Sequence, residues 1–312
     1  MRVVVTGGAG FIGSHVVGAL LDRGDEVVAL DNLSTGRQGN VDARAELVVG
    51  DVRAEDDVRA AFEAARPDIC FHLAAQAGVR VSVDRPAYDC EVNILGTIQI
   101  LEAARRHRTQ VVFASSGGAI YGEHDGPTPE GAERRPLSPY GTSKLAGEEY
   151  LGTYNRLHGS THVSLRLANV YGPRQDPHGE AGVVAIFLGR LARGERPHVF
   201  GDGRQTRDYV FVGDVAKAAL AAAGRPGGVF NVGTGRETSV VELFEACRRV
   251  TGSELDAVFE PPRLGELARS VLDTKLAERE LGFRAQTDLA EGLAATWEFI
   301  RTGEGETKLG TN

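Results

Sequence analysis

The sequence predicts an α/β protein with a doubly wound parallel β-sheet, followed by a smaller C-terminal α/β part. Short β-branched or apolar runs alternate with helical patterns from residue 1 to about 170, which is the order that such a sheet requires. The runs at 46–49, 69–73 and 111–114 are almost continuously apolar, as expected where helices cover both faces. We therefore divide the chain into residues 1–170, residues 171–302 and a polar, glycine-rich tail at 303–312 that is expected to be disordered.

The individual elements follow from the same patterns. The expected strands are 3–6, 26–30, 46–49, 69–73, 111–114 and 162–167. The expected helices are 11–23, 54–65, 87–107 and 139–158. Pro139 suits the first turn of the last helix, and Ser138 before it is a suitable N-cap.

Three glycines, each separated by two residues, lie between the first strand and the first helix. The first permits a tight turn, the second lets the backbone approach a pyrophosphate, and the third lets the helix pack closely on the strand. The N–H groups at the start of the helix would face the phosphates. The residues of this loop and helix start are Gly7, Gly10, Phe11, Ile12 and Gly13.

A carboxylate ends the second expected strand, 18 residues after Gly13. At this position Asp31 would accept hydrogen bonds from the adenosine ribose and would repel a 2′-phosphate. Strand, glycine loop, helix, strand and acid together predict a Rossmann sheet that binds NAD rather than NADP.

Tyr140 and Lys144 stand four residues apart on the expected helix at 139–158, so they share one face. An ammonium near a phenol favours the phenolate and lowers the pKa of the tyrosine. We therefore expect Tyr140 to exchange a proton with a sugar hydroxyl.

Composition excludes several classes of protein. A net charge of −8 argues against nucleic acid or an anionic membrane as partner. Cys70, Cys90 and Cys247 have no metal-binding spacing and are expected to be buried, inert thiols in a reducing cytosol. No apolar run reaches membrane-spanning length, and the N-terminus is expected to be a buried strand rather than a signal peptide, so a cytoplasmic location is expected.

Further motifs follow in order: Asp31-Asn32, Asp51-Val52, His72-Leu-Ala-Ala75, Ser115-Ser116, Ile120-Tyr121-Gly122 and the Tyr140/Lys144 pair. With the glycine loop, the chain resembles the extended short-chain dehydrogenase/reductases over about residues 1–300, and most of all the UDP-glucose 4-epimerases and neighbouring nucleotide-sugar epimerases. The resemblance implies an isomerase that uses NAD to interconvert UDP-glucose and UDP-galactose through a transient 4-keto sugar and NADH.

Alternatives stay open at this stage. The segment from His72 to Arg80 also resembles the UDP-glucuronate 4-epimerases, in which case Arg80 or Arg174 would meet the sugar carboxylate. A dehydratase, a decarboxylase and a non-catalytic NAD-binding regulator are less favoured, the last because the Tyr140/Lys144 pair is intact.

The resemblance also implies roles for individual residues. The adenosine half of NAD would be surrounded by Asp31, Asn32, Ser34, Thr35, Gly36, Asp51 and Val52. The rest of the cofactor site would be formed by Leu73, Ala74, Ala75, Asn93, Ser115, Tyr140 and Lys144. The UDP-sugar would be held by Asn169 at the diphosphate, Val183 and Val184 at the nucleotide, His198, Val199 and Phe200 at uracil, Arg207 and Arg263 at the phosphates, and Glu266, where the family often has Asp.

The chain departs from the family at the third hydroxyl position of the catalytic strand, where Gly117 stands. Ser116 would then reach the sugar, a water would fill the space, or Tyr140 would act directly on the hydroxyl. Gly117 and Gly118 are expected to leave more room near the sugar, and the Ser115 side chain is expected to bond the backbone.

A homodimer is the partner arrangement that the resemblance implies, with the helices at 87–107 and 139–158 packed as a four-helix bundle. Both carry apolar residues at helical spacing, although packing against the sheet explains the same pattern.

Overall fold

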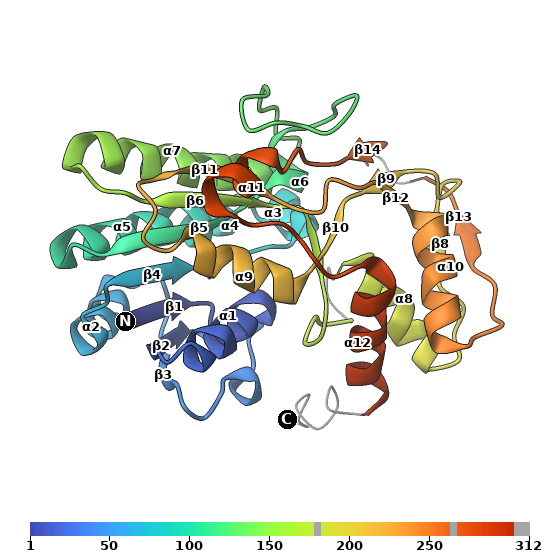
Figure 1. Ribbon diagram of the computed structural model, residues 1–312, viewed down its shortest axis with the longest axis horizontal. Helices are drawn as coiled ribbons and strands as arrows, with labels where there is room; N and C mark the ends of the chain where they lie inside the picture. The colour runs from blue at the N-terminus through green and yellow to red at the C-terminus, as the bar shows by residue number, and fades with distance from the viewer. Residues whose placement is uncertain (178–181, 263–266, 303–312) are drawn as a thin grey trace.

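A seven-stranded, wholly parallel sheet forms the larger part of the computed structural model, which describes residues 1–177, 182–262 and 267–302 (Figure 1). The strand order is β11-β6-β5-β4-β1-β2-β3. The bounds are β1 Arg2–Thr6, β2 Glu26–Asp31, β3 Glu46–Val49, β4 Ile69–His72, β5 Gln110–Ser116, β6 Val163–Leu167 and β11 Gly228–Val232. The doubly wound fold and all six expected strands are confirmed, with ends that differ by at most two residues.

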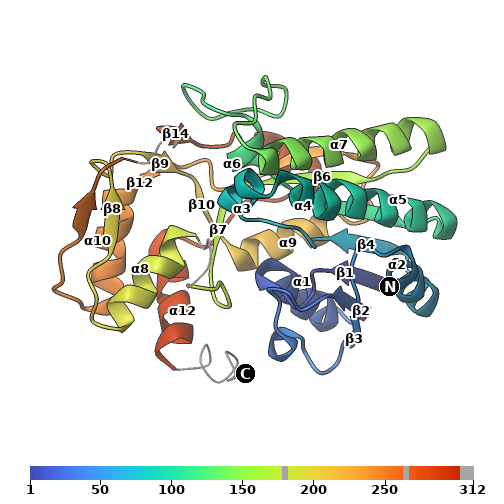
Figure 2. The ribbon, with the colours of Figure 1, turned by 180° about the vertical axis from the view of Figure 1, so that it is seen from behind.

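Helices cover both faces of the sheet (Figures 1 and 2). On one face lie α1 (Phe11–Asp22) and α9 (Val212–Ala222), which pack on each other. On the other lie α2 (Glu55–Ala65), α5 (Gly96–His107) and α7 (Pro139–His158). Ser138 caps α7 as expected, because its hydroxyl accepts a hydrogen bond of 3.1 Å from Gly141 N–H.

The expected helix at 87–107 is a composite run. It comprises α4 (Pro86–Cys90), a π-helical turn η2 (Glu91–Leu95) and α5, and α3 (Val79–Asp84) precedes it. π-helical turns of this kind are rare and are frequently found at functional sites. Asn93 lies in the π-helical turn.

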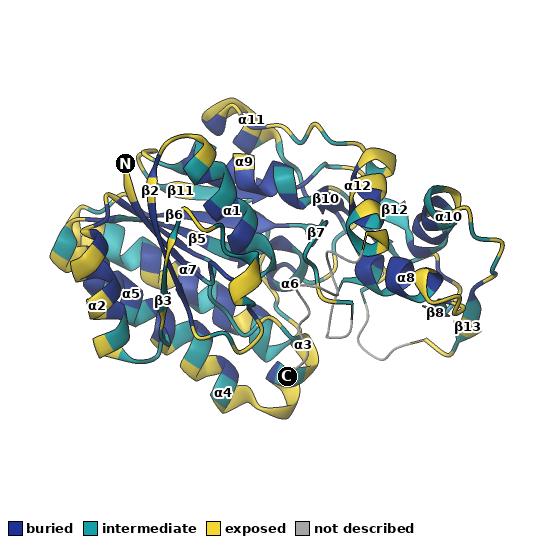
Figure 3. Cartoon of the chain, turned by 90° about the horizontal axis from the view of Figure 1, so that it is seen from below, coloured by how far each residue is buried: buried dark blue, intermediate teal, exposed yellow. Residues whose placement is uncertain are grey.

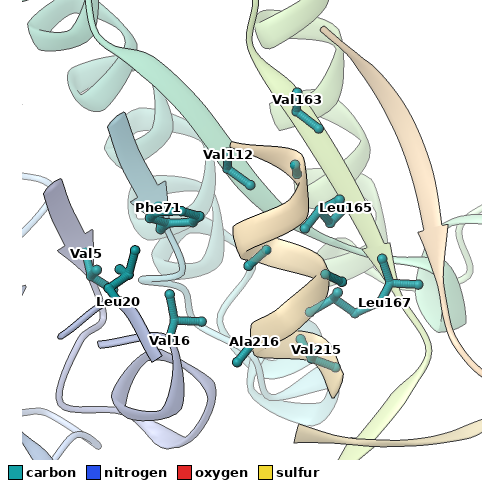
Figure 4. Packing of buried hydrophobic residues seen from close by; sticks show 14 of the residues in the cluster. Val5, Val16, Leu20, Phe71, Val112, Val163, Leu165, Leu167, Val215 and Ala216 are labelled. Atoms are coloured by element: carbon teal, nitrogen blue, oxygen red, sulfur yellow. The ribbon is translucent and has the colours of Figure 1, made fainter. Parts of the chain in front are cut away.

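Two apolar cores lie on either side of the sheet. The first joins the strands to α1 and α9, where Val16, Leu20, Val215 and Ala216 pack on β1, β4, β5 and β6 (Figure 4). The second joins the opposite face to α2, α5 and α7 through Phe62, among others. Figure 3 shows the sheet as the most deeply buried layer. These packed faces fix the carboxyl ends of the strands along one edge.

The chain beyond residue 170 contributes to both parts of the molecule. α9 covers the sheet, and β11 pairs in parallel with β6 at the edge of the sheet. The boundary near residue 170 stays a prediction, and the structure adds that the chain returns to the sheet after it.

The smaller part has its own core. Its helices are α8 (Val183–Ala192), α10 (Val240–Thr251) and α12 (Leu289–Arg301). Its short strands are β7 (Asn169–Tyr171), β8 (His198–Phe200), β9 (Thr206–Arg207), β10 (Tyr209–Phe211), β12 (Thr238–Ser239), β13 (Val258–Glu260) and β14 (Arg269–Ser270). The remaining elements are η1 (Gln38–Asn40), α6 (Gly117–Ile120) and α11 (Lys275–Leu281). Among the helices of the described residues, none combines the length and apolar content needed to cross a membrane.

All three cysteines are free thiols. Cys70 and Cys247 are buried as expected, and burial raises the pKa of Cys247 to about 12. The expectation is wrong for Cys90, which is exposed because it ends α4 at the surface.

Candidate functional site

The glycine loop is packed too closely for side chains. Gly7 has a φ of 69°, and a Cβ there would lie 2.7 Å from the backbone nitrogen of Ala74. A Cβ on Gly13 would collide with the Gly7 carbonyl oxygen. α1 begins after Gly10 with no side-chain cap, so its first N–H groups remain open to an anion. This cradle fits the pyrophosphate of a dinucleotide.

The Asp31 carboxylate lies between the glycine loop and the turn that follows β2. It accepts hydrogen bonds from Ala9 N–H at 3.0 Å and from Leu33 N–H at 2.8 Å. A Cβ on Gly36 would lie 2.7 Å from Asp31 Oδ1, so this turn folds back over the carboxylate. The expected ribose residues Asn32, Ser34 and Thr35 lie on the same turn, where Ser34 N–H donates to Asn32 Oδ1 at 3.0 Å.

Asp51 has a partner that the sequence analysis did not predict. Arg53 donates from Nη2 at 2.7 Å and from Nε at 3.0 Å, and Asn32 Nδ2 donates at 2.9 Å. The Arg53 hydrogen bonds hold the pKa of Asp51 well below its usual range, against the effect of burial. An adenine amino group would have to share the Asp51 carboxylate with Arg53 and Asn32. Val52 is buried against Gly96.

A directed hydrogen-bond chain crosses the carboxyl ends of β1 and β4. Thr97 Oγ1 donates to the Asn93 carbonyl at 2.6 Å, so it accepts from His72 Nε2, which lies 3.1 Å away. His72 Nδ1 then accepts from Thr6 Oγ1 at 2.7 Å. Burial, with the Lys144 charge adding, lowers the pKa of His72 to about 3, so the ring is neutral.

The same series of hydrogen bonds also orients the segment that follows β4. Thr6 Oγ1 accepts from the N–H groups of Leu73 and Ala74, both at 3.2 Å. Leu73 and Ala74 are thereby held beside Gly7, and Ala75 follows them in the chain.

Asn93 joins three segments. Its Oδ1 accepts from Gln76 N–H at 2.9 Å, and its Nδ2 lies 3.0 Å from Asp89 Oδ1 and 3.1 Å from Ser143 Oγ. Ser143 in turn donates to the Tyr140 carbonyl at 3.0 Å. The turn after β4, the helix α4 and the helix α7, which carries Tyr140 and Lys144, are therefore tied together. The sequence analysis missed Gln76 and Asp89, although Asp89 stands four residues before Asn93 on the same helical face.

Lys144 is buried on the inner side of α7, and Tyr140, one turn before it, is half-buried. Lys144 Nζ donates to the Ala114 carbonyl at 2.9 Å and lies 4.8 Å from the centre of the Phe113 ring. Burial lowers the pKa of Lys144 to about 8, with Asp89 opposing the shift.

The expectation that Lys144 lowers the pKa of Tyr140 is wrong for this structure. Burial raises the pKa of Tyr140 to about 12, a hydrogen bond with the Ser116 side chain opposes the shift, and the charge of Asp89 adds to it. Desolvation therefore outweighs any effect of the lysine.

The structure gives a physical reason for Gly117. A Cβ there would lie 2.7 Å from Leu272 Cδ1, so a buried leucine fills the space that a serine would need. Only Gly118 leaves room, with Asn169 Oδ1 at 3.6 Å from its virtual Cβ. Ser116 is the hydroxyl that meets Tyr140. Ser115 does not bond the backbone as expected, since its buried Oγ has no partner within the described residues.

The expected nucleotide-sugar residues are spread over the smaller part. Asn169 begins β7 and its N–H donates to the Asp208 carbonyl at 2.9 Å. Arg207 lies on β9, which also pairs with β14 in the segment leading to Leu272. Val183 begins α8.

Two of the side chains expected to contact the nucleotide are poorly placed to do so. The Val184 and Val199 side chains are fully buried in the core of the smaller part, so they support the site rather than face a ligand. His198 and Phe200 flank Val199 on β8, far from α7 (Figure 1), and His198 Nδ1 lies 3.3 Å from Glu260. The expected Arg263 and Glu266 lie outside the described residues.

The two arginines considered for a sugar carboxylate lie apart in the sequence and fold. Arg80 is exposed on α3, and Arg174 follows β7 with a φ of 69°. His15 Nε2 donates a hydrogen bond of 2.9 Å to the adjacent Pro173 carbonyl, which links this turn to α1.

Comparison with known proteins places this site in a family. Residues 3–233 match the model of the NAD dependent epimerase/dehydratase family. A putative UDP-glucose 4-epimerase of Methanocaldococcus jannaschii is 49% identical over 294 residues, which cover 93% of this chain and 95% of that protein. The structure of UDP-glucose 4-epimerase from Thermotoga maritima with UDP-glucose has a TM-score of 0.95 at 46% identity, covering 97% of this chain and 100% of that one. The Thermus thermophilus UDP-glucose 4-epimerase, solved with NAD, has a TM-score of 0.92 at 46% identity, covering 96% and 99%. The expected resemblance is confirmed, and the chain belongs to the NAD dependent epimerase/dehydratase family.

Proposed function

We propose that the protein is an NAD-dependent isomerase that interconverts UDP-glucose and UDP-galactose at C4. The observation that carries the proposal is the meeting of Ser116 and Tyr140 at the carboxyl end of β5, on the same sheet edge as the glycine loop and Asp31. Relatives named as UDP-glucose 4-epimerases favour this substrate over the UDP-glucuronate alternative.

The residues suggest how protons move. Ser116 would accept the proton of the sugar 4-hydroxyl as it passes its own to deprotonated Tyr140, and the transfer would be reversed on the other face of the sugar. Because burial raises the pKa of Tyr140, the deprotonated form is a minor species near neutral pH in the protein without ligands. Lys144, anchored on the Ala114 carbonyl, places a positive charge on the same face of α7. Bound NAD would supply the hydride acceptor and donor that the change at C4 needs.

The binding groups are proposed on the same basis. Gly7, Gly10 and Gly13 cradle the pyrophosphate of NAD, and Asp31 holds the adenosine ribose. Asn169 is proposed to contact the sugar diphosphate, because its side-chain oxygen borders the open space beside Gly118. Arg207 and Arg263 are proposed phosphate ligands, since a guanidinium binds phosphate oxygens in pairs.

A homodimer is proposed through η2, α5 and α7. Leu95, Tyr150 and Leu157 on these helices are 42%, 39% and 70% exposed, and a partner helix would bury them. We also propose a cytoplasmic location, which the three free thiols support.

The direct test is incubation of the purified protein with UDP-glucose, without added NAD, and detection of UDP-galactose by NMR. A parallel incubation with UDP-glucuronate tests the alternative. Tyr140→Phe should abolish turnover, and Tyr154→Phe on the same helix should retain it. Conversion by Tyr140→Phe at the wild-type rate would refute the proposed chemistry.

A further inference from the structure

A buried carboxylate that the proposed chemistry does not use lies beside the catalytic helix. Asp89 is 1% exposed on α4, and α4 packs directly against α7 (Figure 2). Its Oδ1 accepts hydrogen bonds from Gln76 Nε2 at 2.9 Å and from Asn93 Nδ2 at 3.0 Å. Both of these donors are neutral amides, and a positive charge nearby would offset the cost of burying the carboxylate.

Lys144 supplies that positive charge. Two carboxylates act electrostatically on it, Asp89 from α4 and Glu148 from its own helix. Glu148 is already neutralised by Arg166 of β6 at 2.6 Å. The neighbouring His72 of β4 is neutral because burial depresses its pKa. Of the two carboxylates, Asp89 is therefore the one left to balance Lys144.

The β5 groups that contact Lys144 and Tyr140 are uncharged, so they do not compete with Asp89 as a counter-charge. Among the groups of β5, Lys144 contacts only the Ala114 carbonyl and the Phe113 ring. Tyr140 contacts the hydroxyl of Ser116, the last residue of β5. Lys144 is 3% exposed, so water screens a nearby charge less there than at the surface.

We propose that Asp89 is a positioning residue that provides the counter-charge of the Tyr140–Lys144 pair and so sets the pH range in which the enzyme works. The inference rests on the proposed roles of Tyr140 and Lys144. The same carboxylate orients Asn93, whose amide reaches Ser143 on α7, so charge and geometry are set by one side chain.

The sign of the effect follows from the charge. A negative charge favours the protonated form of both groups, so Asp89→Asn should lower the pKa of Tyr140 and the pKa of Lys144 together. The rate requires a deprotonated Tyr140 and a protonated Lys144, so both limbs of the bell-shaped pH profile should move to lower pH. A shift of about one unit is expected for a neighbouring buried charge. A purely structural loss would lower the rate without moving the limbs.

The experiment measures kcat/KM for UDP-glucose against pH in the wild type, Asp89→Asn and Asp89→Glu. Asp89→Glu retains the charge and should keep both limbs in place. The matched control is Asp214→Asn, which removes a carboxylate that is 0% exposed on α9, across the sheet from α7. Both limbs of the pH profile of Asp214→Asn should stay at their wild-type pH.

A second readout does not depend on turnover. The phenolate absorbance of Tyr140, taken as the difference between each protein and its Tyr140→Phe counterpart, should rise at lower pH in Asp89→Asn. If Asp89→Asn does not fold, Asp89→Ser removes the same charge and is measured in its place. Limbs and phenolate titration that stay at their wild-type pH would overturn the inference. Activity of Tyr140→Phe would instead refute the proposed function, and the two failures are thus distinguishable.

Discussion

Removal of the charge on Glu148 tests how the catalytic helix is held. Glu148 lies one turn after Lys144, and Arg166 of β6 donates to its two oxygens from Nη2 at 2.6 Å and from Nε at 2.9 Å. The two side chains are only 3% and 2% exposed. Arg166 Nη1 also donates to the Tyr121 hydroxyl at 2.7 Å. The pair therefore joins α7, β6 and the end of α6 inside the protein.

The magnitude follows from burial. Two unit charges about 4 Å apart attract by about 4 kcal/mol at an effective dielectric constant of about 20. Removal of one partner of a buried pair costs about 3–5 kcal/mol, because the other charge stays buried and unpaired. We therefore expect Glu148→Gln to lower the free energy of unfolding by about 3–5 kcal/mol. The double variant Glu148→Leu, Arg166→Met should cost less, because no buried charge remains.

Urea unfolding followed by circular dichroism measures these differences. The control is Glu149→Gln on the same helix, whose ion pair with Arg134 is exposed at 57% and 39% and should be worth less than about 1 kcal/mol. The reasoning is refuted if Glu148→Gln costs no more than Glu149→Gln, or if the double variant is less stable than Glu148→Gln.

Three further predictions follow from the structure. Gly13→Ala should cost the protein its retained NAD, measured as nucleotide released on denaturation, whereas Gly18→Ala on the same helix, where a Cβ meets nothing within 4 Å, should keep it. Burial lowers the pKa of His162 from 6.5 to about 4, so the stability that the neutral ring contributes is lost as the pH falls from about 6.5 to 4. His162→Asn should therefore reduce the loss of unfolding free energy between pH 7.5 and 5 by about 2 kcal/mol. An unchanged loss would contradict this. Gly117→Ser should lower the melting temperature, and it should lower it less in a Leu272→Ala background than in the wild type. An equal loss in both backgrounds would show that the contact with Leu272 is not the cause.

Local signals explain what the sequence predicted well. The glycine loop, Asp31 and the first six strands are each encoded in a few consecutive residues, so they could be read without knowledge of distant contacts. Ser138 and Pro139 marked the start of α7 for the same reason.

Long-range pairing explains what was missed. β11 carries Asn231, a polar residue that argues against a buried strand, yet Asn231 is 0% exposed. Its Nδ2 donates to the carbonyls of Thr128 at 2.9 Å and Asp273 at 3.0 Å, from segments about a hundred residues upstream and about forty downstream. No pattern within the strand indicates those partners. The role of Leu272 beside Gly117 was hidden in the same way, since the two are far apart in sequence.

The sequence predicts the bounds of α7 but not which of its faces is buried. Apolar periodicity would turn residues such as Leu157 inward, but Leu157 is 70% exposed. The buried positions are instead Gly141, Ser143, Lys144, Gly147, Glu148 and Leu151. Each buried polar group on this face has a partner on another element: Ser143 on Asn93, Lys144 on the Ala114 carbonyl and Glu148 on Arg166. A helix positioned by such pairs has few alternative registers, because a shift of one residue would leave buried charges unpaired. The interactions that hold α7 in place are thus the ones that align Tyr140 with Ser116, which ties the stability of this helix to its chemistry.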